Sequence, residues 1–409
     1  MPEQPMQALT LMRSSVFSRV LVARAVSDFG NGATLTSVLV MLALHGRSPS
    51  LIALNGLAQA VPALLLAWLA GGLVDRFDRR RVMVVANAAR SVVVLGLVWS
   101  SADTVALIFV VSALQAAIGA FFSPAASAYV ATLLTREDRP AGMGLLQSTS
   151  MVAGVAGTGL GGAAAAWGDS IALVFVLDAV TFVVAAVLVA SIRQSASRPA
   201  RRRPSSLLRD ARAGVSFVTN DSVILVTILA VATTMIGLSM VNVSYAPLVL
   251  NDLGVSPLWL GPLEAVFVVS ALTAGLTTGP LSAKVPPEGM FVAALALFVV
   301  GLALTATAPS VVLLLVAQIF SGCGQALIGV AAAVIWQNRT PDEFRGRVFA
   351  LAQTAQSASA VVGLVVVAVG TSFVSARPLI GIAAALLASS FVVSSFSFRA
   401  ARRSALPPP

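Results

Sequence analysis

The chain has 409 residues, of which 58% are hydrophobic and only 10% are charged, and its net charge is +10. A soluble globular domain is roughly half apolar and about a quarter charged, so this composition excludes an ordinary water-soluble fold and predicts a protein embedded in lipid. The single cysteine, Cys323, and the single histidine, His45, exclude an internal disulfide and metal sites built from Cys and His.

Enzyme chemistry is disfavoured by the same counts. A serine-hydrolase triad would have to use His45, which we expect to be an interfacial residue at the outer end of the first span. The only lysine, Lys284, follows Ala283, so the Gly-Lys-Ser/Thr of a Walker A phosphate loop is absent from the sequence. We therefore expect no enzyme and no cofactor, and a proton gradient as the energy source.

Twelve apolar runs follow one another along the chain, and each approaches the roughly 20 residues that a spanning helix needs. The predicted fold class is an all-α membrane protein with twelve transmembrane helices. The predicted helices are 17–45, 51–73, 82–100, 104–133, 141–167, 170–192, 222–248, 256–283, 288–307, 310–335, 348–373 and 377–397.

The basic residues predict the topology. With both termini in the cytoplasm, all but four of the 26 Lys and Arg residues fall on cytoplasmic segments. The exceptions are Arg47 and Arg377 outside, and Arg24 and Arg90 within spans. This asymmetry is the positive-inside rule, so the charge indicates orientation and we expect no nucleic-acid partner. One lysine among many arginines hints at a high-GC bacterium, and we expect a multi-pass protein of the bacterial inner (cytoplasmic) membrane without a removable signal peptide.

A break in the apolar pattern divides the chain into an N-terminal six-helix bundle (1–192), a cytoplasmic basic linker (193–221) and a C-terminal six-helix bundle (222–409). Within the linker, "SSLLRDARAGVSFV" predicts an amphipathic helix on the inner membrane surface. The two bundles look related, because "TLLTREDRPAGMGLLQS" (132–148) resembles "WQNRTPDEFRGRVFALAQ" (336–353) about 205 residues later. Such a repeat is typical of transporters whose substrate site lies near the midplane between two halves.

The stretch "GGLVDRFDRR" joins the second and third predicted helices and resembles motif A of the major facilitator superfamily, G-x-x-x-D-R/K-x-G-R-R/K. The resemblance extends over essentially the whole chain and implies the major facilitator fold, two pseudo-symmetric six-helix bundles. The residues assigned to the motif are Gly71, Gly72, Asp75, Arg76, Arg79 and Arg80, with Asp78 in place of the usual glycine.

This departure, together with "TPDEFRGRV" in the tenth loop, resembles the branch that holds macrolide-efflux proteins and enterobactin-type siderophore exporters. The resemblance implies that the acid of motif A stabilises the outward-facing state. We expect Asp75 and Arg79 to act in a gate and Arg81 only to anchor the topology. The alternative is that all of these arginines serve topology.

A partial motif C, which the superfamily's antiporters carry in the fifth helix, is formed by Gly144, Gly157, Gly161 and Gly162. The resemblance implies an exporter, although Ala153 and Thr158 replace a glycine and the proline of the motif. Close helix packing by small residues is the alternative. The same stretch, "GTGLGG" (157–162), also fits the dinucleotide-binding pattern with Asp178 as the ribose acid, but no strand precedes it, so we reject that reading.

Coupling to an ion gradient requires a group that can carry charge within the membrane. Carboxyl groups in spans are costly and are functional candidates by default. Ranked by expectation, the proton-coupling candidates are Asp28, Glu264 and Asp178. Asp28 has a competing explanation, because Arg24 lies four residues earlier and could form a structural ion pair with it. The sequence does not decide between H⁺ and Na⁺.

The substrate cavity is expected to be mostly apolar with sparse polar groups. Candidate contacts are Arg24, Asn31, Arg90, Gln115, Gln147, Gln318 and Gln325, with Phe121 and Phe122. Each of these residues could instead serve helix packing. The predicted function is proton-coupled export of an amphipathic small molecule, such as an antibiotic, a siderophore or another secondary metabolite, by a monomer surrounded by membrane lipid. An importer of a small nutrient and a non-transporting membrane sensor remain alternatives.

Overall fold

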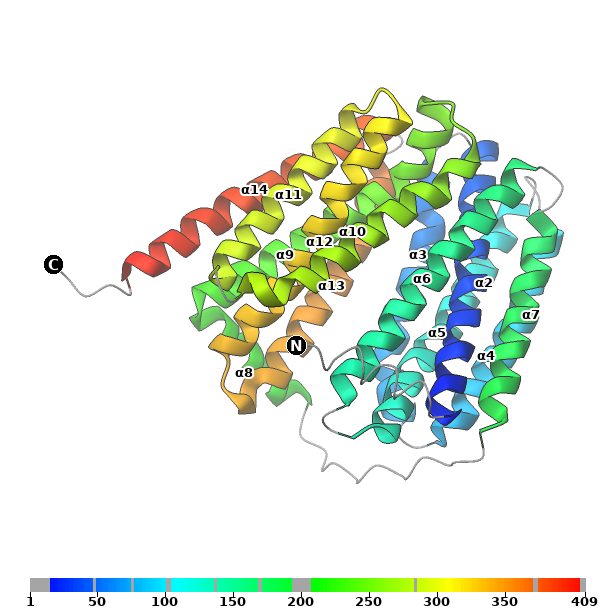
Figure 1. Cartoon of the computed structure of the whole chain (residues 1–409), viewed down its shortest axis with the longest axis horizontal. Coiled ribbons are helices and arrows are strands. Elements are labelled where there is room, and N and C mark those ends of the chain that lie inside the picture. The colour runs from blue at the N-terminus through cyan, green and yellow to red at the C-terminus, as the bar shows by residue number, and fades with distance from the viewer. Residues whose placement is uncertain are drawn as a thin grey trace. The chain divides into compact units, whose positions relative to one another are not determined.

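The structure is a computed structural model that describes residues 15–46, 49–74, 77–100, 104–135, 138–167, 171–192, 207–282, 285–370 and 374–404. Within these ranges all regular secondary structure is helical, and each of the twelve predicted spans corresponds to a helix (Figure 1). By length and composition, nine of the helices in the described parts of the chain can cross a membrane. The fold class predicted from the apolar runs is therefore confirmed.

The first six spans form helices interrupted by one short 3₁₀ turn, η1, which ends α4. Their bounds are α2 (Ser15–Gly46), α3 (Pro49–Val74), α4 (Arg79–Leu95) with η1 (Gly96–Trp99), α5 (Val105–Leu133), α6 (Arg139–Ala166) and α7 (Ile171–Ala190).

The second six spans are preceded by the short helix α8 and are interrupted twice. A π-helical turn, η3, follows Pro247, and a 3₁₀ turn, η4, opens α10. The bounds are α8 (Leu207–Asn220), α9 (Ser222–Pro247), η3 (Leu248–Asp252), η4 (Pro257–Trp259), α10 (Leu260–Ser282), α11 (Pro287–Thr307), α12 (Val311–Arg339), α13 (Asp342–Gly370) and α14 (Ala376–Ser404).

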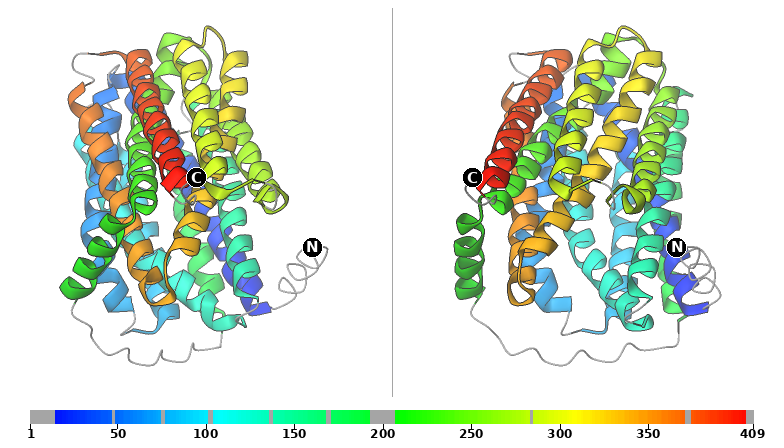
Figure 2. Two further views of the ribbon diagram at one scale, coloured as in Figure 1. Left: turned by 90° about the vertical axis from the view of Figure 1, so that its left-hand side faces the viewer. Right: turned by 60° about the vertical axis from the view of Figure 1, so that its left-hand side comes forward.

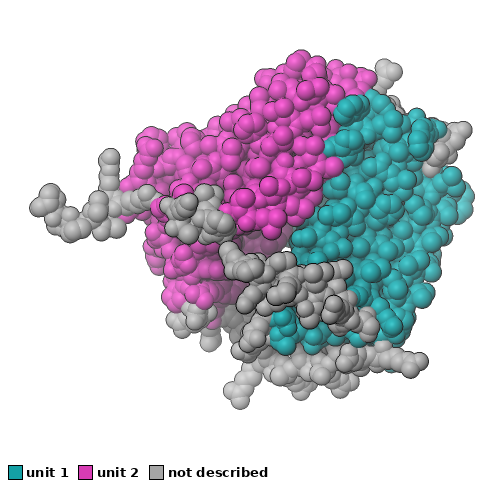
Figure 3. Space-filling view, in the orientation of Figure 1, with its two compact units in different colours: residues 1–47, 54–201, 256–262 teal, residues 48–53, 202–255, 263–409 magenta. Residues whose placement is uncertain are grey.

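The chain forms two compact units, coloured separately in Figure 3. Unit 1 comprises residues 1–47, 54–201 and 256–262, and unit 2 comprises residues 48–53, 202–255 and 263–409. Unit 1 therefore contains most of the first six spans and unit 2 most of the second six, and each also contains a short segment from the other half of the chain.

The two units share one packing scheme. In unit 1, α2 packs on α6 and α7, and α4 packs on α5 and α7; in unit 2, α9 packs on α13 and α14, and α11 packs on α12 and α14 (Figures 1 and 2). These are the same four pairs in chain order. The repeat that the two loop sequences suggested is thus present in the helix packing of each unit.

Two glycines show the repeat at the level of single residues. A Cβ atom at Gly157 of α6 would overlap the carbonyl oxygen of Phe29 in α2, and a Cβ at Gly363 of α13 would lie 2.7 Å from the carbonyl oxygen of Ile236 in α9. Gly363 follows Gly157 by 206 residues. Because a side chain would not fit at either crossing, glycine allows the corresponding helices of each unit to approach closely.

Helix α8 occupies the stretch for which the sequence predicted an amphipathic helix. It packs along α13 within unit 2, as the two views of Figure 2 show. Phe217 stacks on Phe344 with the ring centroids 5.0 Å apart, and Val218 is buried. Arg212 and Val215 remain exposed on the other side. One face of this helix is therefore covered by protein.

Candidate functional site

A cavity of about 260 Å³ lies among the helices of unit 1. Eight of its fourteen lining residues are polar, although apolar atoms supply most of the lining surface. The lining residues are Asn31, Thr34, Leu35, Val38, Asn55, Gln59, Arg90, Leu97, Val111, Ser112, Gln115, Ala116, Gly119 and Asp178.

Arg90 of α4 is the centre of a hydrogen-bonded group at this cavity. Its guanidinium donates to Oδ1 of Asn31 on α2 at 2.6 Å and to Oε1 of Gln115 on α5 at 3.0 Å. Gln115 also donates back to the carbonyl oxygen of Arg90 at 3.0 Å. The guanidinium lies 4.3 Å from the ring centroid of Phe182 on α7. The structure thus brings together three sequence-predicted cavity residues from three helices.

Asp178 of α7 is the second ionisable group of the cavity, and its side chain is only 1% exposed. Its carboxylate accepts hydrogen bonds from Thr34 of α2 at 2.7 Å and from Thr181 of its own helix at 3.2 Å. A Cβ atom at Gly30 would overlap this carboxylate, so glycine makes room for it against α2. Arg90 and Asp178 interact electrostatically, which offsets part of the cost of burying each charge.

Asn55 of α3 supplies an unsatisfied hydrogen-bond acceptor. The residue lines the cavity and is 1% exposed, yet its Oδ1 atom has no hydrogen-bond partner among the described residues. Gln59, one helical turn later on α3, lines the same cavity. A buried polar atom without a partner costs free energy, so Asn55 favours a bound molecule that donates a hydrogen bond.

Asp28, which ranked first among the sequence candidates, forms an ion pair with Arg24 on the same helix at 2.6 Å. The guanidinium of Arg24 also lies 5.5 Å from the ring centroid of Phe122. This is the structural i,i+4 pair that the spacing of the two residues suggested as an alternative. Neither residue is among those that line the cavity.

Glu264 lies in unit 2, in the second turn of α10, and is partly buried. It interacts electrostatically with Tyr245 near the end of α9. The hydroxyl of Tyr245 has no hydrogen-bond partner in the described part of the chain. Glu264 is thus a partly buried acid that interacts with a tyrosine.

The remaining cavity candidates have other surroundings. Gln147 is exposed on α6 and does not line the cavity. Gln318 is buried and donates a long hydrogen bond of 3.5 Å to the carbonyl oxygen of Leu263, which connects α12 with α10. Gln325 is partly buried on α12. Phe121 and Phe122 pack in the apolar core of unit 1. For Gln318 and the two phenylalanines, helix packing is the role that the contacts support.

The motif A stretch is described in part. Gly71 and Gly72 lie in α3, whereas Asp75 and Arg76 fall outside the described residues. Arg79 is buried and donates to the carbonyl oxygen of Ala128 on α5 at 3.2 Å. Arg80 donates to the carbonyl oxygens of Val189, at 3.2 Å, and Ala190. Both arginines therefore bind helix carbonyls within unit 1.

Asp78, the departure from motif A, has a structural role of its own. It is the N-cap of α4, and its carboxylate accepts hydrogen bonds from the backbone nitrogens of Arg80 at 2.9 Å and Arg81 at 3.2 Å. An aspartate at this position satisfies backbone donors that a glycine would leave to water. The replacement of the family's glycine thus strengthens the start of a helix.

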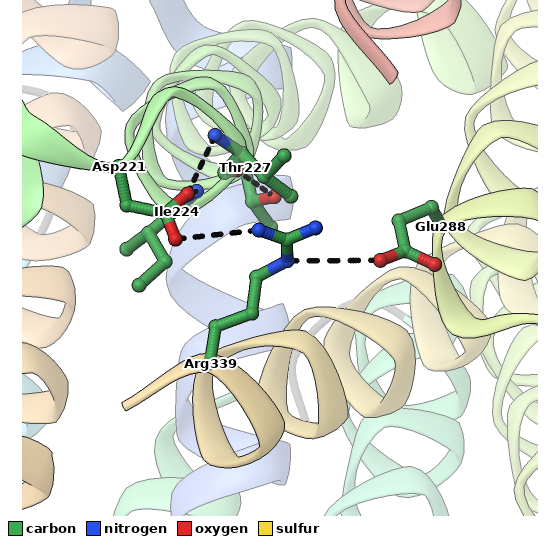
Figure 4. Close-up of polar contacts among 6 residues, drawn as sticks. Asp221, Ile224, Thr227, Glu288 and Arg339 are labelled. Carbon is green, nitrogen blue, oxygen red and sulfur yellow. Dashed lines mark hydrogen bonds and ion pairs between the residues drawn. The ribbon is translucent and has the colours of Figure 1, made fainter. Parts of the chain in front are cut away.

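Unit 2 has a charged cluster at three helix ends, shown in Figure 4. Arg339 lies in the last turn of α12. Its Nη1 atom is 3.3 Å from Oδ2 of Asp221, and its Nε atom is 3.7 Å from Oε1 of Glu288. Asp221 caps α9 by accepting from the backbone nitrogens of Val223 and Ile224, and Glu288 lies in the first turn of α11. Each charge has the sign that its helix end favours.

The partial motif C stretch separates into different environments. Gly157 and Gly161 lie where α6 crosses α2, and a Cβ at either would overlap backbone atoms of that helix. Gly162 lies against the carbonyl of Pro257, which belongs to the same unit. Gly144 has open space around it. Close packing explains the first three glycines and gives no reason for the fourth.

Six polar or aromatic residues of the cavity region were not predicted from the sequence, namely Thr34, Asn55, Gln59, Ser112, Thr181 and Phe182. A signal existed for three of them. Thr34 follows Asn31 by three residues, and Gln59 follows Asn55 by four, so each pair lies on one helix face. Two polar pairs in otherwise apolar helices predict a shared polar face. Nothing in the sequence marks Thr181 or Phe182.

The amino-acid sequence is similar to a known family and to several bacterial transporters. The profile described as Major Facilitator Superfamily matches residues 20–241 and 227–409. The chain is 23% identical over 358 residues to the MFS-type transporter YfiS of Bacillus subtilis (strain 168), covering 84% of each protein. It is 28% identical over 156 residues to the multidrug efflux pump Tap of Mycolicibacterium fortuitum, covering 35% of this chain and 37% of Tap.

A crystal structure of a mutant of the nucleoside transporter NupG has the same fold. It superposes with a TM-score of 0.79 at 10% identity, covering 94% of this chain and 100% of that chain. At this identity the similarity concerns the fold alone.

Proposed function

The chain belongs to the Major Facilitator Superfamily of membrane transporters, and from this premise we propose that it exports an amphipathic small molecule in exchange for protons. In this proposal the protein is a monomer in a bacterial inner membrane, with both termini in the cytoplasm. The exported molecule is an antibiotic, a siderophore or another secondary metabolite.

The observation that carries the proposal is the placement of Asp178. Its carboxylate is almost completely buried in a spanning helix, yet it lines a polar cavity together with Arg90. An acid in this position is costly to keep and typically marks an ion pathway. Release and uptake of a proton at Asp178 would change the balance of charge with Arg90, and so would alter the hydrogen bonds around the cavity.

Asp28 and Glu264 are secondary candidates for the same role. Asp28 is paired with its own cation, Arg24, whose Nε lies 2.6 Å from the carboxylate, and it does not line the cavity. Glu264 lies outside the cavity of unit 1. In our proposal Asp178 therefore replaces Asp28 as the first proton-carrying residue.

Outward transport is supported by two resemblances. One is the similarity to the efflux pump Tap, which extends over about a third of this chain. The other is the partial motif C of the superfamily's antiporters and the resemblance to macrolide-efflux and siderophore exporters at "GGLVDRFDRR" and "TPDEFRGRV". Both favour export over import.

The proposal is tested by measuring accumulation of a panel of dyes and antibiotics in a pump-deficient bacterium that expresses the chain, with and without a protonophore. We expect accumulation to fall for at least one compound, and the protonophore and Asp178→Asn each to abolish this effect. Asp252→Asn is the matched control, because Asp252 is exposed and, within the described ranges, forms an ion pair with Arg377 at 3.6 Å.

Two results would contradict the proposal. Efflux that Asp178→Asn leaves intact would remove Asp178 from the coupling path. Higher accumulation in expressing cells, dependent on the gradient, would show an importer.

A further inference from the structure

We propose that the cavity of unit 1 binds a neutral, hydroxyl-rich head group of the exported molecule, of the kind a glycosyl unit provides. This inference rests on the proposed function and adds a chemical class to its substrate.

The donor and acceptor pattern of the cavity is the first argument. Four carboxamide side chains line it, Asn31 from α2, Asn55 and Gln59 from α3, and Gln115 from α5. A carboxamide offers both donors and an acceptor on one planar group. A hydroxyl group also donates and accepts, so neighbouring hydroxyls on a ring match such a lining.

One buried oxygen atom, Oδ1 of Asn55, indicates that the bound molecule should donate a hydrogen bond. Oδ1 of Asn55 is buried and has no hydrogen-bond partner among the described residues, so a donor that reaches this atom during binding would remove the cost of leaving it unpaired. A hydroxyl supplies that donor, whereas an ether, an ester or an apolar ring does not. The carboxamide of Gln115, by contrast, is already held by two hydrogen bonds with Arg90.

The charges of the cavity favour a neutral ligand. Arg90 and Asp178 line the same space and carry opposite charges that interact with each other. Arg90 is further held by Asn31 and by the ring of Phe182. The two charges offset each other, so the lining offers no net charge that would attract a cationic or an anionic head group.

The size of the cavity limits the ligand to one part of a molecule. Sites for drug-sized ligands occupy roughly 300–1,000 Å³, and this cavity measures about 260 Å³. Its apolar residues, such as Leu35 and Val111, provide a surface for the nonpolar faces of a sugar ring. The cavity therefore suits a polar head group, and the rest of an amphipathic molecule lies outside it.

Binding is tested directly on the purified full-length chain in nanodiscs. The probes are the 4-nitrophenyl β-D-glucoside, galactoside, mannoside and maltoside, with 4-nitroanisole as the sugar-free control and tetraphenylphosphonium as the cationic control. We expect at least one glycoside at ten times its Kd to raise the melting temperature by about 2 °C, and neither control to do so. A rise with tetraphenylphosphonium or 4-nitroanisole and with no glycoside would overturn the inference.

Variants place the binding in the cavity. Gln59→Leu and Asn55→Leu should each weaken glycoside binding at least tenfold, and Gln59→Leu keeps the test valid if the buried Asn55 variant fails to fold. Gln337→Leu, the same change at an exposed residue of α12, is the matched control and should bind as the unaltered protein does. Undiminished glycoside binding by folded Gln59→Leu and Asn55→Leu would overturn the assignment to this cavity.

The result is separable from the proposed function. Glycoside binding in nanodiscs needs no proton gradient, so glycoside binding by a protein whose efflux the protonophore leaves unchanged would keep the head-group inference and remove proton coupling. Efflux that depends on Asp178, in a protein that binds no glycoside, would overturn the head-group inference and leave proton-coupled export standing.

Discussion

Thr34 of α2 donates a hydrogen bond of 2.7 Å to the carboxylate of Asp178 on α7. The bond joins two helices that pack along each other, at the wall of the polar cavity. A hydrogen bond to a charged group contributes about 1.5–3 kcal/mol, which corresponds to roughly 10- to 100-fold in an equilibrium. This contact therefore holds the proposed proton-carrying residue in one position.

We predict that Thr34→Val reduces proton-coupled transport in liposomes by roughly 10- to 100-fold, measured with a pH-sensitive dye trapped inside. Thr34→Ser keeps the hydroxyl and should retain most of the activity. Thr233→Val is the control, because Thr233 is partly buried on α9 and its hydroxyl donates to the carbonyl oxygen of Leu229 on its own helix. Equal activity of Thr34→Val and Thr233→Val would show that the hydrogen bond has no part in coupling.

Glycine substitutions on α6 should have effects of opposite sign. Gly157→Ala places a Cβ onto the carbonyl of Phe29, so we expect a loss of about 1–3 kcal/mol in stability from overpacking. Gly144→Ala adds a Cβ where nothing lies within 4 Å, and alanine is favoured over glycine in a helix by about 0.5–1 kcal/mol. Melting curves of the two purified variants measure this difference in stability. A Gly157→Ala protein as stable as Gly144→Ala would contradict the close crossing of α6 and α2.

Because Asp78 is the N-cap of α4, we predict the order of stability of three variants at this position. Asp78→Ala should lower the free energy of unfolding by about 0.5–2 kcal/mol. Asp78→Gly, which restores the family's usual residue, should lower it by only a few tenths of a kcal/mol. Asp78→Asn keeps the cap and should be close to neutral. The three melting temperatures give the order, and a glycine variant less stable than the alanine variant would reverse it.

Asp221 should matter more to stability than Arg339, although the two residues form one ion pair. Arg339 is 37% exposed, and exposed pairs typically contribute about 0.2–1 kcal/mol. Asp221 also caps α9 through two backbone hydrogen bonds, so Asp221→Ala loses about 1 kcal/mol more. Asp221→Asn preserves the cap and should cost no more than Arg339→Gln, which also loses the ion pair with Glu288. Thermal unfolding in detergent measures all three, and equal losses for Asp221→Ala and Asp221→Asn would exclude the capping role.

The twelve helices could be predicted because a bilayer leaves the backbone few choices. An apolar run of sufficient length must satisfy its own hydrogen bonds, and a helix does so within one segment. What the runs do not show is where a helix changes type. The 3₁₀ turn η1 after Leu95 and the π-helical turn η3 after Pro247 depend on local backbone contacts that hydropathy does not report.

The candidate site could be predicted only residue by residue. Asn31, Arg90 and Gln115 each stood out as polar residues in apolar spans, but they are far apart in the sequence, so their meeting depends on the packing of α2, α4 and α5. The ranking of the acids could not be predicted for the same reason. Arg24 beside Asp28 is a local signal, whereas the burial of Asp178 comes from helices elsewhere in the chain.

The shared packing scheme of the two units means that the scaffold and the polar centre are separable. A close glycine crossing lies at corresponding helices of both units, at Gly157 and at Gly363. Arg90 and Asp178, by contrast, both belong to unit 1. The helix arrangement alone therefore does not determine the chemistry, which depends on the few polar side chains that each half places in its interior.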